Sequence, residues 1–438
     1  MMSGRSTLGT LARYVLSNAA LPASALVTSP ILARELLPAG RGEVAVVLAM
    51  FTLGSLLVTI GLPWVASLSA GESSISARYA STLAWLGLGA SILGGIVLWT
   101  LAPLLLAKVP DSVPLLRVCA VSLPIFQAIN IWRGAALGAR LYGAINAERV
   151  TNAIARIVLI GGLALSSHLT VQSAILSMVV GPMIGGVLMI TLTVRPLASR
   201  VRSHSSTPRS IASTLNSGSK SLWAEGSGAL NSRLDQSIMP SLTTTTQIGL
   251  YSVAVTLAEL PAQVIDAVKA VAFAEGNARG KIALIAQACR CLIALLVAVL
   301  AVFCPAVAML IGPFFGPEFA DSVPMFFILS LGAIPLAIGS VLGGGLVILG
   351  KQHWQAVGST LGLLLSLPVL LALTTNVGAM GAALASVISY SVMAVTVTYI
   401  FTKQGRVTVR ECLVVTRADL KTVAHRAPGI KGRVREPQ

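Results

Sequence analysis

Apolar runs long enough to cross a membrane constrain this 438-residue chain more than any other feature. A helix needs about 20 predominantly apolar residues to span the hydrocarbon core of a bilayer. Twelve such runs follow one another with short links between them. They lie near residues 9–33, 44–70, 79–107, 113–138, 147–167, 170–194, 218–242, 249–272, 288–312, 322–349, 355–375 and 378–402. The sequence therefore predicts an all-α polytopic membrane protein with about twelve transmembrane helices.

Composition excludes a water-soluble fold, because apolar residues make up 55% of the chain and charged residues only 11%, with a mean hydropathy of +0.85. The five cysteines show no paired spacing, and the four histidines are scattered over links and tail. Neither a disulfide framework nor a metal site is indicated. We expect no metal, no organic cofactor and no catalytic residues.

Positive charge is unevenly distributed along the chain and sets its expected orientation. The net charge is +16, and lysines and arginines gather in alternate links and in the tail. Cytoplasmic segments of membrane proteins carry such an excess. With both termini inside, the outer links receive only Arg34, Arg41, Lys108 and Arg117. We expect a multi-pass protein of the cytoplasmic (inner) membrane with both termini cytoplasmic, in contact with membrane lipids and without a nucleic-acid partner.

A Ser-rich basic segment at residues 196–217 divides the chain near its midpoint and has the composition of a solvated linker. We expect an N-terminal six-helix lobe over residues 1–195 and a C-terminal six-helix lobe over residues 218–402. The linker between them and the basic tail over residues 403–438 are both expected to be cytoplasmic.

The two halves share an internal repeat. The tetrapeptide DSVP opens the fourth run at residue 111 and the tenth run at residue 321, an offset of 210. Gly42 matches Gly249 at an offset of 207, and Ser177 matches Ser386 at 209. Each half begins and ends inside, so the repeats are parallel and related by an axis along the membrane normal. Two such lobes can rock against each other and expose a central cavity alternately to each side.

Charged side chains within apolar runs mark the expected cavity. We predict helices at residues 218–242 and 249–270, each with a polar stripe opposite an apolar face. Ionisable groups are costly in hydrocarbon and usually face a polar interior or a partner, which applies equally to Arg156 in a first-lobe span. The repeat equates Arg13 and Asn18 with Lys220 and Glu225. The candidate cavity residues are Arg13, Asn18, Arg156, Glu225, Arg233, Asp235, Glu259, Gln263 and Asp266.

Two interpretations of Arg233 and Asp235 are open. They can bind a sugar or a diphosphate, since the planar fork of an arginine matches phosphate oxygens. Alternatively they belong to structural ion pairs, for example Arg233 with Glu259 or Asp266, because charges within membranes often pair.

The other charged groups also allow a specific and a structural interpretation. Glu225 and Asp235 are candidate coupling sites for H+ or Na+, or else part of a wetted polar wall. Arg156 faces either the shared cavity or a polar contact within its own lobe. Arg133 lies near the cytoplasmic end of its run, where we expect it to extend to the headgroups.

One segment of the second half resembles a known family. Residues 231–260, NSRLDQSIMPSLTTTTQIGLYSVAVTLAEL, resemble the seventh and eighth helices of polysaccharide exporters of the O-antigen flippase type, in the multidrug, oligosaccharidyl-lipid and polysaccharide flippase superfamily. Residues 31–49, ILARELLPAGRGEVAVVLA, and 381–401, GAALASVISYSVMAVTVTYIF, are similar to that family as well. The resemblance implies two pseudo-symmetric six-helix lobes forming a V. The family's Asn-Ser-Arg-x-Asp pattern falls on residues 231–235 and adds Asn231 to the candidate cavity residues.

The resemblance also implies a function. It implies a flippase or exporter that moves a lipid-linked oligosaccharide or polysaccharide precursor across the cytoplasmic membrane by alternating access of the two lobes. The lipid-linked saccharide would be the substrate, and a glycan polymerase and glycosyltransferases of a biosynthetic pathway would be partners. The charges of the candidate cavity are mixed, which disfavours a strongly anionic glycan.

Other functions belong to different classes. A cation-coupled multidrug extrusion transporter of the same superfamily would use more aromatic lobes, and aromatics make up only 5% of this chain. A peptidoglycan lipid II flippase is a further alternative within the superfamily. A membrane-embedded glycan polymerase or ligase is disfavoured, because the outer links are short and lack a cluster of histidines or carboxylates. We therefore expect a transporter and not an enzyme.

Overall fold

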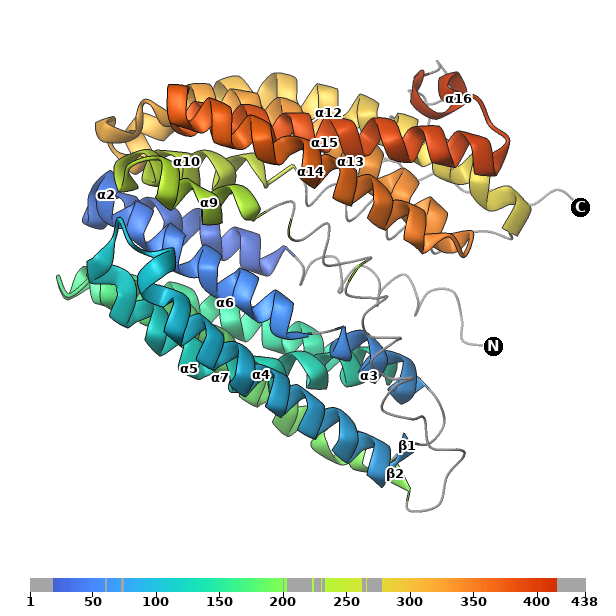
Figure 1. The fold of residues 1–438 in the computed structure, drawn as a ribbon, viewed down its shortest axis with the longest axis horizontal. Helices are drawn as coiled ribbons and strands as arrows, with labels where there is room; N and C mark the ends of the chain where they lie inside the picture. Colours follow the sequence, from blue (N-terminus) through green and yellow to red (C-terminus); the bar gives the residue numbers. More distant parts are fainter. Residues whose placement is uncertain are drawn as a thin grey trace, which may run out of the picture.

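A computed structural model of the chain (Figure 1) describes residues 19–59, 61–71, 75–199, 201–202, 223, 230, 233–261, 265 and 278–415. The N-terminal lobe consists of α2 (Ala20–Thr59), α3 (Leu62–Gly71), α4 (Ala77–Leu105), α5 (Val113–Gly138), α6 (Tyr142–Leu165) and α7 (Val171–Ala198). The C-terminal lobe consists of α9 (Leu234–Leu242), α10 (Thr245–Ala258), α12 (Ala278–Phe315), α13 (Ser322–Ile348), α14 (Gln352–Val377) and α15 (Ala379–Gly405).

Short elements complete the described structure. The 3-10 turns η1 (Pro110–Ser112) and η2 (Pro317–Phe319) precede α5 and α13, and α16 (Val409–Leu413) follows α15. Two-residue strands β1 (Ile75–Ser76) and β2 (Val201–Arg202) pair in parallel. The pair joins the link before α4 to the beginning of the predicted linker.

The predicted all-α polytopic fold is confirmed. Within the described residues, eight helices are long and apolar enough to cross a membrane. The run predicted at 113–138 coincides with α5, which begins directly after η1 with a proline in its first turn. A proline is favoured there, since the first N–H groups of a helix have no partner within the helix. In the second half, η2 precedes the second copy of the tetrapeptide and α13 begins within that copy.

Helix α2 includes parts of two predicted spans, 9–33 and 44–70. It can do so because the chain reverses direction at Leu37. That residue has a left-handed φ of 56° and stands before Pro38, and the residue before a proline is disfavoured in α-helix. Arg41 Nη2 lies 3.4 Å from Ser29 Oγ, although the two residues are 12 positions apart. In a straight helix their Cα atoms would lie about 18 Å apart along the axis. We call residues 20–36 the first arm of α2 and residues 38–59 the second arm.

Two predicted spans are interrupted in the structure. The span at 44–70 breaks between α2 and α3, where Gly61 adopts a φ of 66°. The prediction of one continuous helix over 249–270 was wrong. Helix α10 ends at Ala258, and a turn follows through Pro261. Pro261 disfavours helix at the residue before it, and the turn leaves Glu259 at the end of α10.

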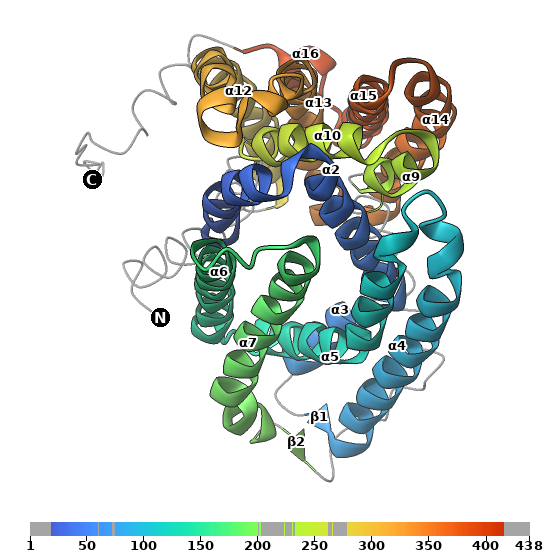
Figure 2. The ribbon, with the colours of Figure 1, turned by 90° about the vertical axis from the view of Figure 1, so that its left-hand side faces the viewer.

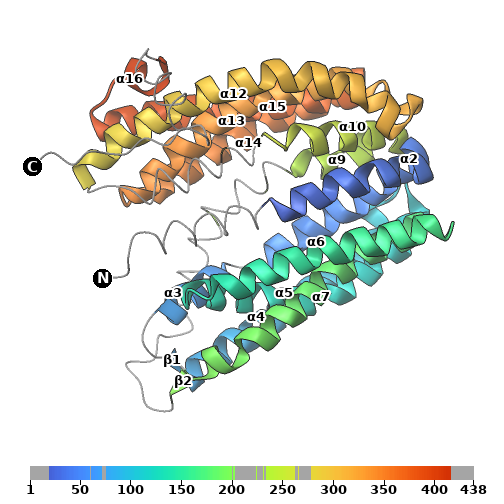
Figure 3. The same cartoon turned by 180° about the vertical axis from the view of Figure 1, so that it is seen from behind.

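The two lobes meet at one end and diverge toward the other, forming a V (Figures 1 and 3). Helix α2 packs on α9, α10, α12 and η2, and so carries the contact between lobes. At the closed end one hydrophobic core runs through both lobes and includes Val46, Tyr251 and Phe319. Toward the open end the cores are separate, one around Phe401 in the C-terminal lobe and another around Leu62 in the N-terminal lobe.

The repeat is visible in the contact between α2 and α10. A Cβ on Gly42 would lie 1.9 Å from the carbonyl oxygen of Thr245, and a Cβ on Gly249 would lie 1.9 Å from that of Pro38. Both pairs are related by the offset of 207, so each half makes the same contact with the other. Gly42 and Gly249 thus allow the backbones of α2 and α10 to touch.

A second pair of contacts follows the same symmetry. Ser112 donates to Glu43 Oε2 at 3.1 Å, and Ser322 donates to the carbonyl of Leu250 at 2.9 Å. The repeat equates the two serines, and it equates Glu43 with Leu250. Each DSVP segment therefore binds the helix that carries its own lobe's contact glycine.

Candidate functional site

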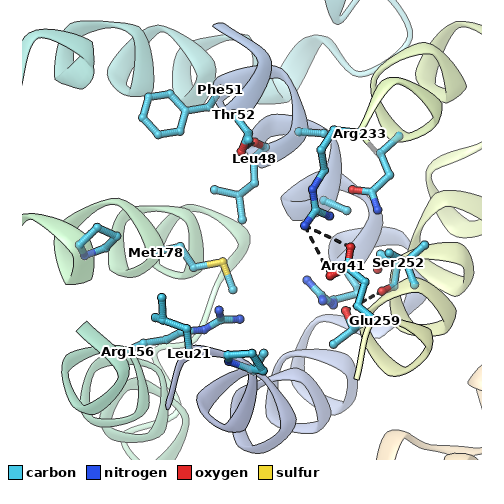
Figure 4. A pocket seen from close by; sticks show the side chains of 18 of the residues that line it. Leu21, Arg41, Leu48, Phe51, Thr52, Arg156, Met178, Arg233, Ser252 and Glu259 are labelled. Carbon is cyan, nitrogen blue, oxygen red and sulfur yellow. Dashed lines mark hydrogen bonds and ion pairs between the residues drawn. The ribbon is translucent and has the colours of Figure 1, made fainter. Parts of the chain in front are cut away.

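A cavity of about 490 Å³ lies between the lobes, within the size range of ligand-binding pockets. The N-terminal lobe contributes residues of α2, α5, α6 and α7 to its wall, and the C-terminal lobe contributes residues of α9 and α10. Figure 4 shows Arg41, Arg156, Arg233 and Glu259 around this space. The cavity therefore gathers charged side chains from both lobes between apolar walls.

Two arginines of the N-terminal lobe are held by adjacent residues on the first arm of α2. Arg156 on α6 donates through Nε to Thr28 Oγ1 at 3.0 Å, and Arg41 donates through Nη2 to Ser29 Oγ at 3.4 Å. Both partners are neutral hydroxyls, and within the described residues neither arginine has a carboxylate at ion-pair distance. Arg41 Nε is buried without a hydrogen-bond partner there. This side of the cavity is thus cationic and keeps donors for an anion.

The C-terminal wall carries an ion pair. Arg233, the N-cap of α9, lies with Nη2 3.2 Å from Glu259 Oε1 at the end of α10. The side chains are 36% and 46% exposed, so water reaches both. This is the pair that sequence analysis offered as the structural interpretation of Arg233. Since both residues line the cavity, the pair is also within reach of a ligand.

Asp235 points away from this cavity into the C-terminal lobe. Its Oδ2 accepts hydrogen bonds from the Tyr251 hydroxyl and from Ser386 Oγ, the latter at 2.9 Å, and its Oδ1 accepts from the Gln236 N–H at 2.7 Å. Asp235 is 7% exposed. It lines a separate cavity of about 50 Å³ together with Tyr251, Glu259 and Tyr390. Val255 and Glu259 line both cavities, so the two spaces adjoin at this side of α10.

The repeat relates these two polar clusters. At the offset of 207, Thr28 and Ser29 correspond to Asp235 and Gln236. In the first half this dipeptide is neutral and receives two arginines. In the second half its first position is a carboxylate that receives hydroxyls. The same point of the fold therefore binds two arginines in one lobe and holds a buried carboxyl group in the other.

The structure brings together part of the predicted site. Arg156, Arg233 and Glu259 line the interlobe cavity. Both interpretations of Arg156 hold, because it lines the shared cavity and also bonds to Thr28 within its own lobe. Asp235 lies beside it in the smaller cavity. The remaining candidates lie outside the described residues: Arg13, Asn18, Glu225, Asn231, Gln263 and Asp266.

Arg41 and Arg133 both lie in environments other than those predicted for them. Arg41 was assigned to an outer link, yet the second arm of α2 begins before it and buries it in the cavity wall. Arg133 does not extend to headgroups, since it forms a two-bond ion pair with Glu148 at 2.5 and 2.9 Å. The buried Glu148, 2% exposed, needs this cation. Neither contact leaves a signal in local sequence.

The sequence profile of the family described as "Polysaccharide biosynthesis protein" matches residues 31–324. That range covers the residues that line the interlobe cavity from Arg41 to Glu259. No curated protein is similar enough in sequence to count as a relative of this chain.

Solved transporter structures share the fold at low sequence identity. An inward-facing multidrug resistance MATE family transporter of the MOP superfamily superposes with a TM-score of 0.67 at 16% identity, covering 93% of this chain and 99% of that chain. The lipid II flippase MurJ in an inward closed conformation gives 0.63 at 13% identity, covering 94% and 91%. An outward-facing MATE family transporter gives 0.53 at 14% identity, covering 94% and 97%. The chain thus has this fold.

Proposed function

The chain belongs to the polysaccharide biosynthesis protein family, and from that membership we propose that it is a flippase for a lipid-linked oligosaccharide or polysaccharide precursor. The two lobes rock about the contact of α2 with α10 and expose the interlobe cavity to each side in turn. Transport on this proposal involves no covalent chemistry. MurJ, described as a lipid II flippase, has the same fold, which supports a lipid-linked substrate.

The observation that carries the proposal is the pair of arginines on the N-terminal side of the cavity. Arg41 and Arg156 are held by hydroxyls and keep donors for a ligand. A guanidinium binds phosphate oxygens through two parallel N–H groups and stays charged when partly buried. The diphosphate of an isoprenoid carrier fits such a pair, and the saccharide would face Arg233, Glu259 and Gln236.

Drug extrusion is the second candidate, since the fold is shared with multidrug resistance transporters. A cationic drug would meet Arg41 and Arg156 without a compensating carboxylate among the described residues of that wall. Like charges disfavour such a ligand by repulsion. A lipid II flippase remains compatible, because its substrate also joins a lipid to a saccharide through a diphosphate.

Orientation and coupling complete the proposal. The lobes diverge at the end that carries α3 and the start of α14 (Figure 1), which the distribution of arginine and lysine places in the cytoplasm. The chain would then be inward-facing in the cytoplasmic membrane with both termini inside. Asp235 is the described candidate for coupling to H+ or Na+, because it is a buried carboxylate next to the cavity.

A reconstituted assay tests the substrate class. Purified protein in vesicles would be given a fluorescent isoprenoid-diphosphate oligosaccharide, the corresponding isoprenoid monophosphate sugar and a cationic dye. We expect transfer of the diphosphate compound between leaflets and little movement of the dye. Transport of the dye with no transfer of the saccharide would contradict the proposal and favour drug extrusion.

A further inference from the structure

Helices α4 and α5 lie side by side in the N-terminal lobe (Figure 2). A second large cavity lies between them. It is an open groove of about 340 Å³, lined by one side of α4 from Ser91 to Trp99 and by one turn of α5 from Ala120 to Pro124. The hydroxyl of Ser91 donates to the carbonyl of Leu88 in its own helix, so the wall of the groove is effectively apolar. None of these residues lines the interlobe cavity.

Small residues create the groove. A Cβ on Gly95 would lie 3.0 Å from the carbonyl oxygen of Ala120, so α4 and α5 are close together at this glycine. Larger side chains stand on both rims, where Ile96 and Val121 are 56% and 66% exposed. In a membrane-spanning protein such exposed apolar rims face lipid. The groove therefore opens toward the hydrocarbon region of the bilayer.

A cation closes one end of the groove. The guanidinium of Arg117 lies 5.3 Å from the ring centroid of Trp99, and Trp99 itself forms the end of the groove wall. Arg117 Nε is buried without a hydrogen-bond partner among the described residues. The exposed Lys108 and Asp111 in the link between α4 and α5 have opposite charges and offset each other. Arg117 is the cation that contacts the groove wall at this end, through Trp99.

We propose that this groove binds one acyl chain of an anionic phospholipid whose phosphate is held by Arg117. The stretch from Ser91 to Trp99 is about 12 Å long at helical rise, long enough for part of a single hydrocarbon chain but not for a saccharide. The cation lies at the end of the groove near the end of α4, and the apolar wall continues from it toward the middle of the helix. A phospholipid in the leaflet where α4 ends has its phosphate and its acyl chain in the same order. Under the proposed orientation this is the outer leaflet.

The occupant is a resident membrane lipid and not the transported substrate. The groove lies on the lipid-facing side of α4 and α5, where Trp85, Leu104 and Val118 are also exposed. Because it shares no wall with the interlobe cavity, a lipid bound there does not pass between the lobes. The inference is therefore independent of which substrate the protein moves.

Lipid retention tests the proposal on the full-length protein. The protein would be placed in nanodiscs containing equal phosphatidylglycerol and phosphatidylcholine, extracted into mild detergent, and its retained lipids measured by native mass spectrometry. We expect the wild type to retain about fivefold more phosphatidylglycerol than phosphatidylcholine. One lysine or arginine near a membrane surface favours an anionic lipid by about this factor. Arg117→Ala should abolish this preference, and Val121→Trp should lower retention of both lipids by filling the groove.

Lys403→Ala is a matched control, because Lys403 also lies over an aromatic ring, that of Tyr399 at 5.7 Å, but outside the groove. It should retain the wild-type preference. Equal retention of both lipids by the wild type, or an unchanged preference in Arg117→Ala, would overturn the proposal. So would full retention by a monodisperse Val121→Trp protein, since that variant changes only the lipid-facing rim.

Discussion

Arg34 joins the two lobes at their closed end by donating through Nε to the carbonyl oxygen of Phe314, at 2.9 Å. The arginine lies near the end of the first arm of α2, and Phe314 is in the last turn of α12. A second bond runs from Arg34 Nη2 to the carbonyl of Pro313. Carbonyls at a helix C-terminus lack partners within the helix and attract a cation. The contact can exist only while the lobes meet at this end.

Arg34→Ala should shift the protein toward the state that opens at this end. The bonds are exposed to solvent, so their loss should cost about 1 kcal/mol and change the ratio of the two states by roughly fivefold. Distances between spin labels on the two lobes would report the shift. Lys108→Ala, which removes an exposed cation on the same side, should leave the distances unchanged. Equal distance distributions in both variants would show that Arg34 does not hold the lobes together.

Gly42→Ala should disrupt the contact between α2 and α10. Its Cβ would meet a backbone carbonyl, which cannot rotate away as a side chain can. We expect a destabilisation of about 1 to 3 kcal/mol, typical of overpacking, and a lower thermal midpoint in detergent. Gly161→Ala is the control, because a Cβ there has nothing within 4 Å. A midpoint for Gly42→Ala as high as that of the control would mean that α2 and α10 pack less closely in the membrane.

Arg156 is expected to bind the substrate, and its removal tests this directly. Arg156→Ala should lower transport of the diphosphate compound by about tenfold or more, since a hydrogen bond to a charged group contributes about 1.5 to 3 kcal/mol. Arg195→Ala removes an exposed cation of α7 and should have no effect. Normal transport by Arg156→Ala would remove it from the binding site.

A double variant distinguishes the two possible roles of Arg233, which are substrate binding and a structural ion pair with Glu259. Arg233→Ala alone leaves Glu259 without its cation, which disfavours an anionic ligand nearby. If the pair is structural, removing Glu259 as well should restore most transport, because no unpaired charge remains. If Arg233 binds substrate, the double variant should stay as impaired as the single one. We expect the second result, since Arg233 lines the cavity.

Asp235→Asn should remove coupling without unfolding the lobe. The amide oxygen can still accept from Tyr251 or Ser386, whereas the negative charge is lost. We expect transport that no longer responds to an imposed H+ or Na+ gradient, measured in the vesicle assay. Ser386→Ala keeps the carboxylate and should keep the response. A gradient response in Asp235→Asn equal to that of the wild type would exclude Asp235 as the coupling site.

The proposed orientation predicts which links accept label from outside whole cells. A cysteine replacing the exposed Glu318 should react with an impermeant thiol reagent, and one replacing the exposed His353 should not. Both would be made in a variant without Cys291, because this native thiol is partly exposed while the other four are buried. Labelling at position 353 without labelling at position 318 would reverse the orientation.

The sequence predicted the fold well because apolar length and charge distribution report on the membrane directly. The runs at 113–138 and 322–349 match α5 and α13 within a residue. Backbone breaks were harder to foresee. Gly61 ends one helix inside an apolar run, and the turn before Pro261 interrupts another. Hydropathy does not register such breaks, since most of the residues around them are apolar.

The site was only partly predictable for a different reason. A charge in an apolar run signals a polar environment, so Arg156, Arg233 and Glu259 could be placed in the cavity. The exact partner of each charged side chain cannot be inferred from such a signal. Asp235 turned toward Tyr251 on the next helix and toward Ser386, which lies 151 residues further along the chain. Arg41 stood next to a predicted span and resembled an ordinary loop residue until the reversal at Leu37 placed it inside.

The contact through Gly42 and Gly249 is self-complementary, since each half offers the other the same glycine and the same carbonyl position. That is the property of the interface in a two-fold homodimer, where one patch binds its own copy. A single six-helix chain carrying such a glycine and carbonyl would offer this same contact to a second copy of itself. Gene duplication and fusion would then convert a dimer into one polypeptide without building a new interface, and would leave each half free to acquire its own charges.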